Sequence, residues 1–284
     1  MTRIACLQIP ARETAEDATD IAVTLAEQAI DQGATVLCLP EYCGGLRTEG
    51  AQFAPPVFSE PSHPTVKRMK ALAAERNVWV LVGSVAVTGK DTRYSNRSLL
   101  IDDTGEVVAR YDKLHLFDID LGEQGTYRES DTVFPGEQAV VVDTPFGTVG
   151  MSVCYDLRFG GLYRDMAFAG AEILTIPAAF TKTTGEAHWH VLNRARAIET
   201  GTFVVAPCMI GEVPGGGAAY GHSLIIDPWG KVLADGGEGV GIAIADIDVS
   251  LSPATRAKVP NLKHERAFGI TRRNAIRPSE VAAS

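Results

Sequence analysis

Residues 148–159, TVGMSVCYDLRF, join an apolar strand-like run to a polar turn, and the rest of the chain is arranged around that junction. Val149, Met151 and Val153 alternate with small or polar residues, which is the period-two pattern of a strand. The pattern ends at Cys154. A thiol there is held by a rigid strand and can still face a cleft, so Cys154 is either a nucleophile or a buried structural cysteine.

Outward from this junction, short apolar runs alternate with segments of helical spacing, and several neighbouring runs are joined by tight turns. Strands are predicted at residues 4–9, 35–39, 78–82, 94–101, 106–111, 138–142, 148–153, 173–177, 203–207, 222–226, 231–233 and 241–248, and helices at 14–33, 64–76, 161–170 and 186–199. The recurring strand-helix-strand-strand order predicts an α/β fold: a four-layer α-β-β-α sandwich of two mixed sheets.

The helix predicted over 186–199 carries one face that we expect to be buried and several charged residues that can pair along it. The expected buried residues are Val191, Leu192, Ala195 and Ile198. His188 and His190 are two positions apart on this helix, so they point to different faces and form no metal-binding pair.

Composition narrows the class of protein. With 284 residues, 45% of them hydrophobic, and no linker-like segment, the chain is expected to form one domain over 1–284. Its net charge of −9 argues against nucleic acid or an anionic membrane surface as the partner, and no apolar run approaches the ~18 residues of a membrane span. The tail from 253 to 284 is charged and proline-punctuated, so we expect it to pack on a partner subunit.

The five cysteines, at positions 6, 38, 43, 154 and 208, are odd in number and lack the spacing of a metal site. They suggest neither a disulfide framework nor a zinc site, and a reducing cytoplasm is the expected location.

Two further polar residues follow predicted strands. Glu41 comes directly after the doubly buried strand 35–39, so it either lies in a ligand crevice at the sheet's carboxyl edge or is a solvated loop residue. Lys113, between Leu114 and the strand 106–111, is either held in a cleft as a fixed charge or extends its head to water.

The motifs LPEY at 39–42, RYDKLHLFDID at 110–120, GMSVCYDLRF at 150–159 and GHSLIIDPWG at 221–230 occur in an order that resembles the nitrilase superfamily of carbon-nitrogen hydrolases. The resemblance covers nearly the whole chain. It implies Glu41 as general base, Lys113 as cationic stabiliser, Cys154 as nucleophile and Glu129 as a second assisting glutamate. It implies no metal or organic cofactor, and it implies a homodimer or a larger homo-oligomer.

CYDLRF, KLHLFDID and the run HWHVLNRARAIE at 188–199 look most like the Nit branch, which includes ω-amidases and the amidase of deaminated glutathione. The likeness therefore implies a small carboxylated amide as substrate. The expected substrate contacts are Tyr155 through its N–H, Arg158, Phe180 and Thr181. The chain departs from its relatives at Gly160-Gly161, where Pro-Glu is common, and a looser turn is expected there.

Four alternatives stay open at this point. A nitrilase and an N-carbamoyl amino acid hydrolase use the same three residues, so the triad does not separate them from an amidase. A catalytically silent binding module would usually lack one of the three, and all three are present. A nucleotide-binding α/β protein is disfavoured because the chain has no phosphate-binding loop.

Overall fold

Two six-stranded mixed sheets form the centre of the protein in a computed structural model that describes residues 1–50, 52–120, 122 and 126–273. The first sheet has the order β18 (Gly241–Ile247), β1 (Thr2–Gln8), β2 (Val36–Cys38), β5 (Trp79–Thr88), β6 (Tyr94–Ile101), β7 (Val107–Asp112). The second has the order β10 (Val140–Thr144), β11 (Gly147–Met151), β12 (Ile173–Thr175), β13 (Phe203–Ala206), β16 (Leu224–Ile226), β17 (Val232–Asp235).

Both sheets repeat one pairing pattern. In each, the first pair of neighbours is antiparallel, the next two pairs are parallel, and the last two pairs are antiparallel. The predicted recurrence of strand-helix-strand-strand sets is therefore confirmed as two halves of like topology.

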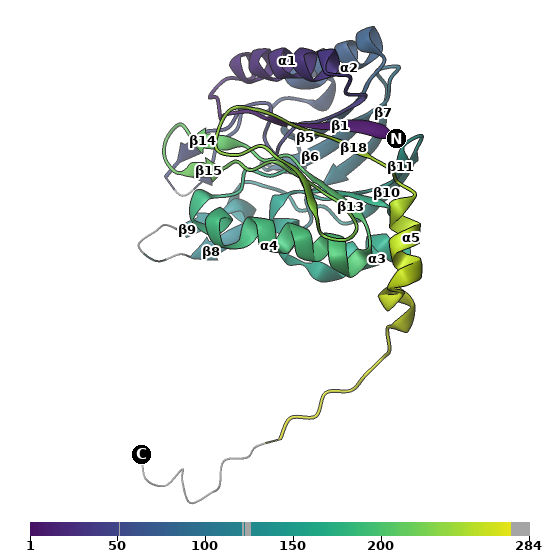
Figure 1. The fold of residues 1–284 in the computed structure, drawn as a ribbon. Coiled ribbons are helices and arrows are strands. Elements are labelled where there is room, and N and C mark those ends of the chain that lie inside the picture. Colours follow the sequence, from purple (N-terminus) through teal and green to yellow (C-terminus); the bar gives the residue numbers. More distant parts are fainter. Residues whose placement is uncertain (51, 121, 123–125, 274–284) are drawn as a thin grey trace, which may run out of the picture.

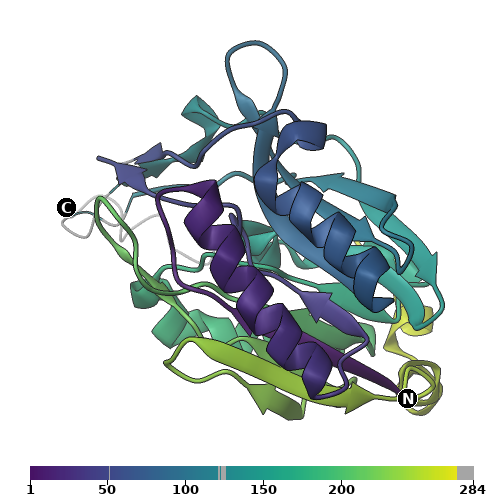
Figure 2. The ribbon, with the colours of Figure 1, turned by 90° about the horizontal axis from the view of Figure 1, so that it is seen from above.

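Helices cover the outer face of each sheet (Figure 1). The first sheet carries α1 (Ala15–Asp31) and α2 (Pro64–Arg76), which run side by side when seen from above (Figure 2). The second carries α3 (Gly160–Phe168) and α4 (Lys182–Thr200). The four-layer α-β-β-α sandwich is thus the observed architecture.

The strands next to α1 and α2 are buried on both faces, which explains why their sequences are continuously apolar. In β1, Ile4 and Cys6 belong to the core between the two sheets, whereas Ala5 and Leu7 belong to the core beneath the helices. The period of two along the strand therefore distributes one apolar run over two cores.

The buried face of α4 differs from the predicted one. Val191 and Ile198 are 67% and 51% exposed, and Leu192 and Ala195 are only partly buried. The helix instead buries Thr184, Gly185, Trp189, Asn193, Arg196, Ala197 and Thr200. The prediction was wrong because it assigned the aliphatic side chains to the core, while this helix packs through one tryptophan, small residues and hydrogen-bonded polar groups.

Short elements connect and border the layers. They are β3 (Thr48–Glu49), β4 (Gln52–Phe53), β8 (Asp118–Asp120), β9 (Thr126–Arg128), β14 (Ile210–Glu212) and β15 (Ala218–Tyr220), with 3₁₀ turns at Glu60–Ser62, Glu129–Asp131, Cys154–Arg158 and Asn261–His264. Across the described ranges, none of the helices has both the length and the apolar composition needed to cross a bilayer.

Helix α5 (Leu251–Lys258) packs against the same chain. Ser252 Oγ donates to the Gly201 carbonyl at 2.6 Å, and the Arg256 guanidinium donates to the carbonyls of Thr200 and Ala171. The predicted tail boundary at 253 therefore falls inside a docked helix. Beyond it, the Asn261 amide still donates to the Glu199 carbonyl and Arg164 still pairs with Glu265, and only then does the chain run away from the body (Figure 1). Residues 274–284 of the predicted tail lie outside the described residues.

Candidate active site

Glu41, Lys113 and Cys154 line one narrow pocket at the carboxyl ends of their strands. Glu41 follows β2, Lys113 follows β7, and Cys154 comes three residues after the end of β11, so the two sheets contribute from both sides. All three are buried, with exposures of 2%, 1% and 7%. Glu41 and Lys113 therefore lie in a buried pocket and not at the solvated surface.

The Lys113 ammonium is held between two carboxylates. Its Nζ lies 2.9 Å from Glu41 Oε1 and 3.0 and 2.8 Å from the two oxygens of Glu129. Backbone N–H groups hold the carboxylates from behind: that of Ala179 donates to Glu41 Oε2 at 2.8 Å and that of Phe117 donates to Glu129 Oε2 at 2.6 Å. Because every group is fixed, the positive charge occupies one defined point beside the thiol.

Burial and charge set the protonation states of this cluster. Burial alone would lower the pKa of Lys113, but the charges of Glu129 and Glu41 outweigh it and raise that pKa well above 10.5, so the ammonium stays charged. Burial, and then the charge of Glu41, raise the pKa of Cys154 well above 9.0, against the opposing effect of Lys113. The resting thiol is therefore protonated and needs a base during attack.

Asn96, which is not among the predicted site residues, links the two carboxylates. Its Nδ2 donates to Glu41 Oε1 at 2.9 Å and lies 3.3 Å from Glu129 Oε1. The Tyr42 hydroxyl also donates to Glu129 Oε1 at 3.1 Å and lies 3.3 Å from the Tyr94 hydroxyl. The sequence shows only that a polar amide lies within the predicted strand 94–101. A buried asparagine needs a partner, but the sequence does not show which groups lie beside it.

Cys154 sits on a sharp turn. Its φ of 48° lies in the left-handed region, which costs about 1–2 kcal/mol for a residue with a Cβ. Its N–H donates to the carbonyl of Pro177 at 2.9 Å, which ties the turn to the segment after β12. A backbone held in this unusual conformation aims the side chain into the pocket.

The buried carboxylate of Asp156 organises the same turn, and Asp156 is likewise not among the predicted site residues. Oδ2 accepts from the Tyr111 hydroxyl at 2.6 Å and from the Val153 N–H at 2.8 Å. Oδ1 accepts from the His115 N–H at 3.0 Å and lies 2.7 Å from His115 Nδ1, while that ring stacks on Phe159 at 3.6 Å. Asp156 thus joins the strand that delivers Cys154 to the segment that delivers Lys113.

Three of the four predicted substrate contacts line the pocket: Tyr155, Phe180 and Thr181. Arg158 lies beside it, with its guanidinium 5.8 Å from the ring centroid of Tyr155 and 5.4 Å from that of Phe180. Both terminal nitrogens of Arg158 are 3.4 Å from His188 Nδ1. The positively charged guanidinium of Arg158 therefore lies over two aromatic side chains that line the pocket.

Gly160 and Gly161 occupy the first turn of α3 and do not line the pocket. A Cβ at Gly160 would lie 3.3 Å from the Arg196 guanidinium, whereas one at Gly161 would meet nothing within 4 Å. The departure from the relatives' Pro-Glu therefore changes a helix start on the surface.

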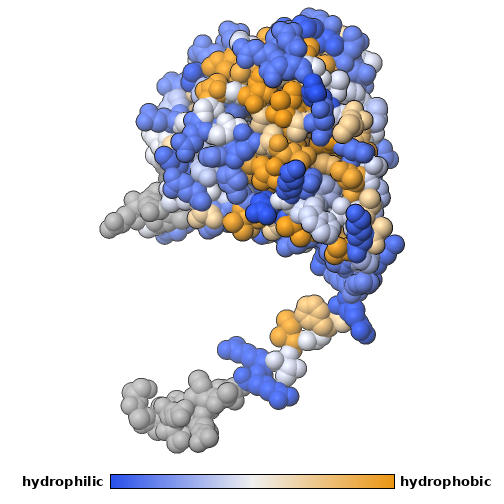
Figure 3. All heavy atoms as spheres, viewed as in Figure 1, coloured by the Kyte–Doolittle hydropathy of each residue, from blue (hydrophilic) through white to orange (hydrophobic). Residues whose placement is uncertain are grey.

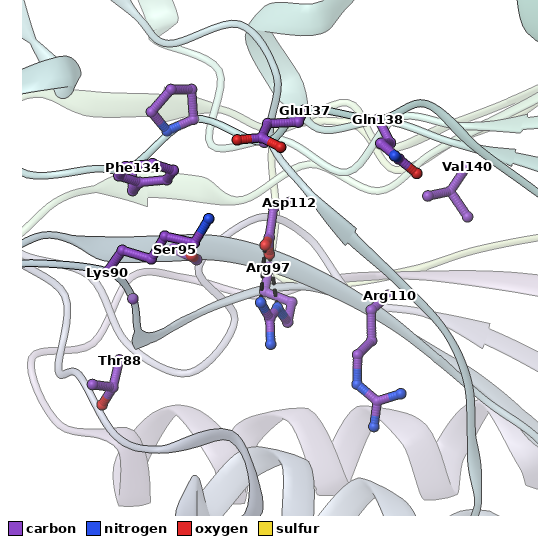
Figure 4. A pocket seen from close by; sticks show the side chains of 13 residues that line it. Thr88, Lys90, Ser95, Arg97, Arg110, Asp112, Phe134, Glu137, Gln138 and Val140 are labelled. Carbon is purple, nitrogen blue, oxygen red and sulfur yellow. Dashed lines mark hydrogen bonds and ion pairs between the residues drawn. The ribbon is translucent and has the colours of Figure 1, made fainter.

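A larger hollow of about 470 Å³ lies elsewhere, at the end of the β5–β6 hairpin (Figure 4). Three of its charged side chains are held in ion pairs: Arg97 pairs with both oxygens of Asp112, and Arg97 and Arg110 both pair with Glu60, which lies outside the hollow. Because the residues lining it include no cysteine, it offers no thiol nucleophile.

Comparisons with known proteins agree with this geometry. The family model described as carbon-nitrogen hydrolase matches residues 3–257. The chain is 42% identical over 206 residues to a deaminated glutathione amidase of Yersinia enterocolitica, covering 72% of each chain, and 37% identical to that of Dictyostelium discoideum, covering 94% of each.

Among solved structures, the C. elegans NitFhit protein superimposes with a TM-score of 0.83 at 32% identity. That alignment covers 93% of this chain and 65% of the other, so the chain spans about two thirds of the NitFhit polypeptide. Family model, relatives and fold agree with the predicted resemblance: this chain belongs to the carbon-nitrogen hydrolases of the nitrilase superfamily, in its Nit-like branch, and is an amide-hydrolysing enzyme.

Proposed function

We propose that this enzyme hydrolyses a small carboxylated amide through a thioester on Cys154. The observation that carries the proposal is the buried Lys113 ammonium, held between Glu41 and Glu129 in the pocket that also contains the thiol. This arrangement supplies a nucleophile, a base and a fixed positive charge within one water-poor space, where charge–charge interactions are strong.

In the first half-reaction, the Cys154 sulfur attacks the amide carbon while the Glu41 carboxylate accepts the thiol proton. The carbonyl oxygen becomes an oxyanion, which an N–H of Lys113 and the N–H of Tyr155 stabilise. One such donor is typically worth ~3 kcal/mol in the transition state. Glu41 then gives its proton to the leaving nitrogen, the C–N bond breaks, and ammonia or an amine departs.

In the second half-reaction, Glu41 removes a proton from water, and the resulting hydroxide attacks the thioester carbon. The C–S bond breaks, the carboxylic acid leaves, and the proton returns to sulfur. Glu129 holds Lys113 in place through both of its oxygens, so the ammonium remains available in both halves.

We propose that the substrate belongs to the class named for the curated relatives, deaminated glutathione, or to the related ω-amides. Arg158 would bind the substrate carboxylate, because its guanidinium stands against Tyr155 and Phe180 at the pocket wall. Replacing Arg158 with Ala should raise KM for carboxylated amides by ~10-fold or more, and should leave KM for uncharged butyramide unchanged. An equal rise in KM for the carboxylated amide and for butyramide would show that Arg158 does not bind the substrate carboxylate.

The reaction is tested by incubating the enzyme with deaminated glutathione, ω-amides, nitriles and N-carbamoyl amino acids, and measuring the released acid by mass spectrometry. We expect the carboxylated amides to be turned over fastest. Cys154→Ala should abolish turnover, and trapping with substrate should add the acyl mass to wild type only. Preferential turnover of nitriles or of N-carbamoyl compounds would replace the substrate assignment while keeping the thiol chemistry.

We further propose a single hydrolase domain that acts as a homodimer or larger homo-oligomer in the reducing cytoplasm. Apolar side chains gather on the face seen in Figure 3, and the extended tail carries Phe268 and Ile270 at 87% and 90% exposure. Such side chains favour burial against a second copy, with the tail on the partner subunit. All five cysteines are unpaired, which suits a reducing compartment. Light scattering coupled to size exclusion should give at least twice the 30.3 kDa chain mass.

A further inference from the structure

A cluster of metal-ligating side chains lies beside the middle of α4, outside the Cys154 pocket. His190 comes from α4, His222 from the turn before β16, and Asp235 from the end of β17, and their ligand atoms all lie within 4.8 Å of one another. His190 Nε2 is 3.0 Å from Asp235 Oδ2, and His222 Nδ1 is 2.8 Å from Asp235 Oδ1. Side-chain exposures of 33%, 19% and 34% leave the cluster open to solvent.

Neighbouring groups hold these side chains in place. The His222 ring stacks on Tyr220 with centroids 4.7 Å apart, and the two histidine rings are 5.0 Å apart. Asp235 Oδ1 also accepts the Gly237 N–H at 2.9 Å. These contacts fix the orientation of both histidine rings and of the Asp235 carboxylate.

We propose that His190 Nε2, His222 Nδ1 and a carboxylate oxygen of Asp235 bind a first-row divalent cation such as Zn²⁺, with water completing the coordination. Two imidazoles and one carboxylate are a ligand set suited to zinc and its first-row neighbours. Ca²⁺ and Mg²⁺ prefer sets made entirely of oxygen, so they are disfavoured. The three ligands come from positions far apart in the chain, which is why the spacing of His188 and His190 alone gave no sign of the site.

The position of the cluster gives the ion a structural role near the pocket. Trp189, beside His190, donates its indole N–H to the His222 carbonyl at 2.7 Å. Its ring packs on Phe180 with centroids 5.0 Å apart, and Phe180 lines the Cys154 pocket. An ion joining His190 to His222 would stabilise the outer side of this wall, at a distance from the reacting atoms.

The test is metal binding by the tag-free full chain carrying Cys154→Ala, because the thiol and carboxylates of the catalytic pocket would also attract Zn²⁺. Calorimetric titration with Zn²⁺ should show one saturable site per chain. His190→Gln and Asp235→Asn should each weaken binding by at least ~10-fold, whereas His264→Ala, which removes an exposed histidine elsewhere, should not. Co²⁺ should give visible ligand-field bands without thiolate charge transfer.

A rise in Tm on adding Zn²⁺ should accompany binding and disappear in His190→Gln. Circular dichroism and the metal-free Tm establish that each variant is folded before it is titrated. Two results would show that the cluster is only a hydrogen-bonded group. One is the absence of saturable Zn²⁺ binding to Cys154→Ala. The other is an unchanged Zn²⁺ affinity when His190→Gln or Asp235→Asn is added to Cys154→Ala. Because the readout is binding, this result does not depend on the proposed reaction.

Discussion

The charge balance around Lys113 depends on side chains that do no chemistry themselves. One ammonium faces two carboxylates, and each carboxylate is kept in place by neutral donors such as the Asn96 amide and the Ala179 N–H. A buried carboxylate that loses a donor either moves or takes up a proton. The neutral donors should therefore matter for rate as well as for folding.

A substitution at Asn96 measures how much a neutral donor to the two carboxylates contributes to the rate. Asn96→Leu removes the donor to both carboxylates at similar volume, and a misplacement of about 1 Å in a catalytic group can cost ~10²-fold. We expect kcat to fall by about that factor with little change in KM, measured by steady-state kinetics.

Asn193→Leu is the matched control. Asn193 is also fully buried, donates to one backbone carbonyl, and has an unpartnered Oδ1 as Asn96 does, but it lies on α4 away from the carboxylates. It should lower stability while leaving kcat near wild type. If Asn96→Leu and Asn193→Leu lowered kcat equally, the loss in Asn96→Leu would be due to impaired folding and not to the position of the carboxylates.

The buried imidazole of His63 should make the stability of the protein fall at acidic pH. Its ring is fully buried with neither nitrogen hydrogen-bonded, and burial lowers its pKa from 6.5 to about 4. As pH falls from 6.5 to 4, the unfolded chain binds a proton that the folded chain does not, so the free energy of unfolding falls by up to ~3 kcal/mol. Above pH 6.5 both states are neutral and this loss is absent.

Denaturant unfolding at several pH values should show this decline in wild type and a smaller decline in His63→Leu. His264→Ala, which removes an exposed histidine, should retain the wild-type decline. Parallel curves for wild type and His63→Leu would assign the acid sensitivity to other groups.

At the level of elements, the sequence indicates most strands and helices because their apolar periods are regular. It also places Glu41, Lys113 and Cys154 at strand ends. It does not reveal Asn96 or Asp156, because their roles depend on which strands lie side by side, and periodicity carries no such information. It also misjudges α4, where hydrogen bonding outweighs hydropathy.

Helix α4 illustrates that last point. Arg196 is buried, donates from Nε and Nη2 to the Leu157 carbonyl at 3.1 and 2.9 Å, and lies over the Tyr163 ring. It thereby ties the helix to the turn that carries Cys154. Arg196→Ala should lower the free energy of unfolding by ~2 kcal/mol or more, whereas Val191→Thr should change it by less than ~0.5 kcal/mol.

Chemical denaturation of the two variants distinguishes the helix faces. A large loss with Val191→Thr and a small one with Arg196→Ala would restore the aliphatic face as the buried one. Activity provides a second readout, since only the arginine variant should also disturb the nucleophile turn.

At the scale of the whole molecule, the first and the last strands of the described chain pair in one sheet. Strand β1 pairs along its full length with β18, so that Thr2 lies opposite Ile247. Without β18, one side of β1 would expose unpaired backbone groups, and such edges promote aggregation.

A chain ending at residue 240 should therefore be insoluble or unfolded. A chain ending after His264 keeps β18 and α5 and should remain folded, as judged by circular dichroism and Tm. A soluble, cooperatively unfolding 1–240 fragment would show that the first sheet is stable without its last strand.

The pairing of β1 with β18 also has a consequence for the order in which the two sheets can form during synthesis. All strands of the second sheet lie within residues 140–235. In the first sheet, by contrast, Thr2 of β1 pairs with Ile247 of β18, which is synthesised 245 residues later. During synthesis, all strands of the half that bears Cys154 are therefore present once residue 235 has been made, while the sheet that bears Glu41 still lacks its edge strand. Because domains fold as units, we expect the pairing of β18 with β1 to be the step that completes the two-sheet core.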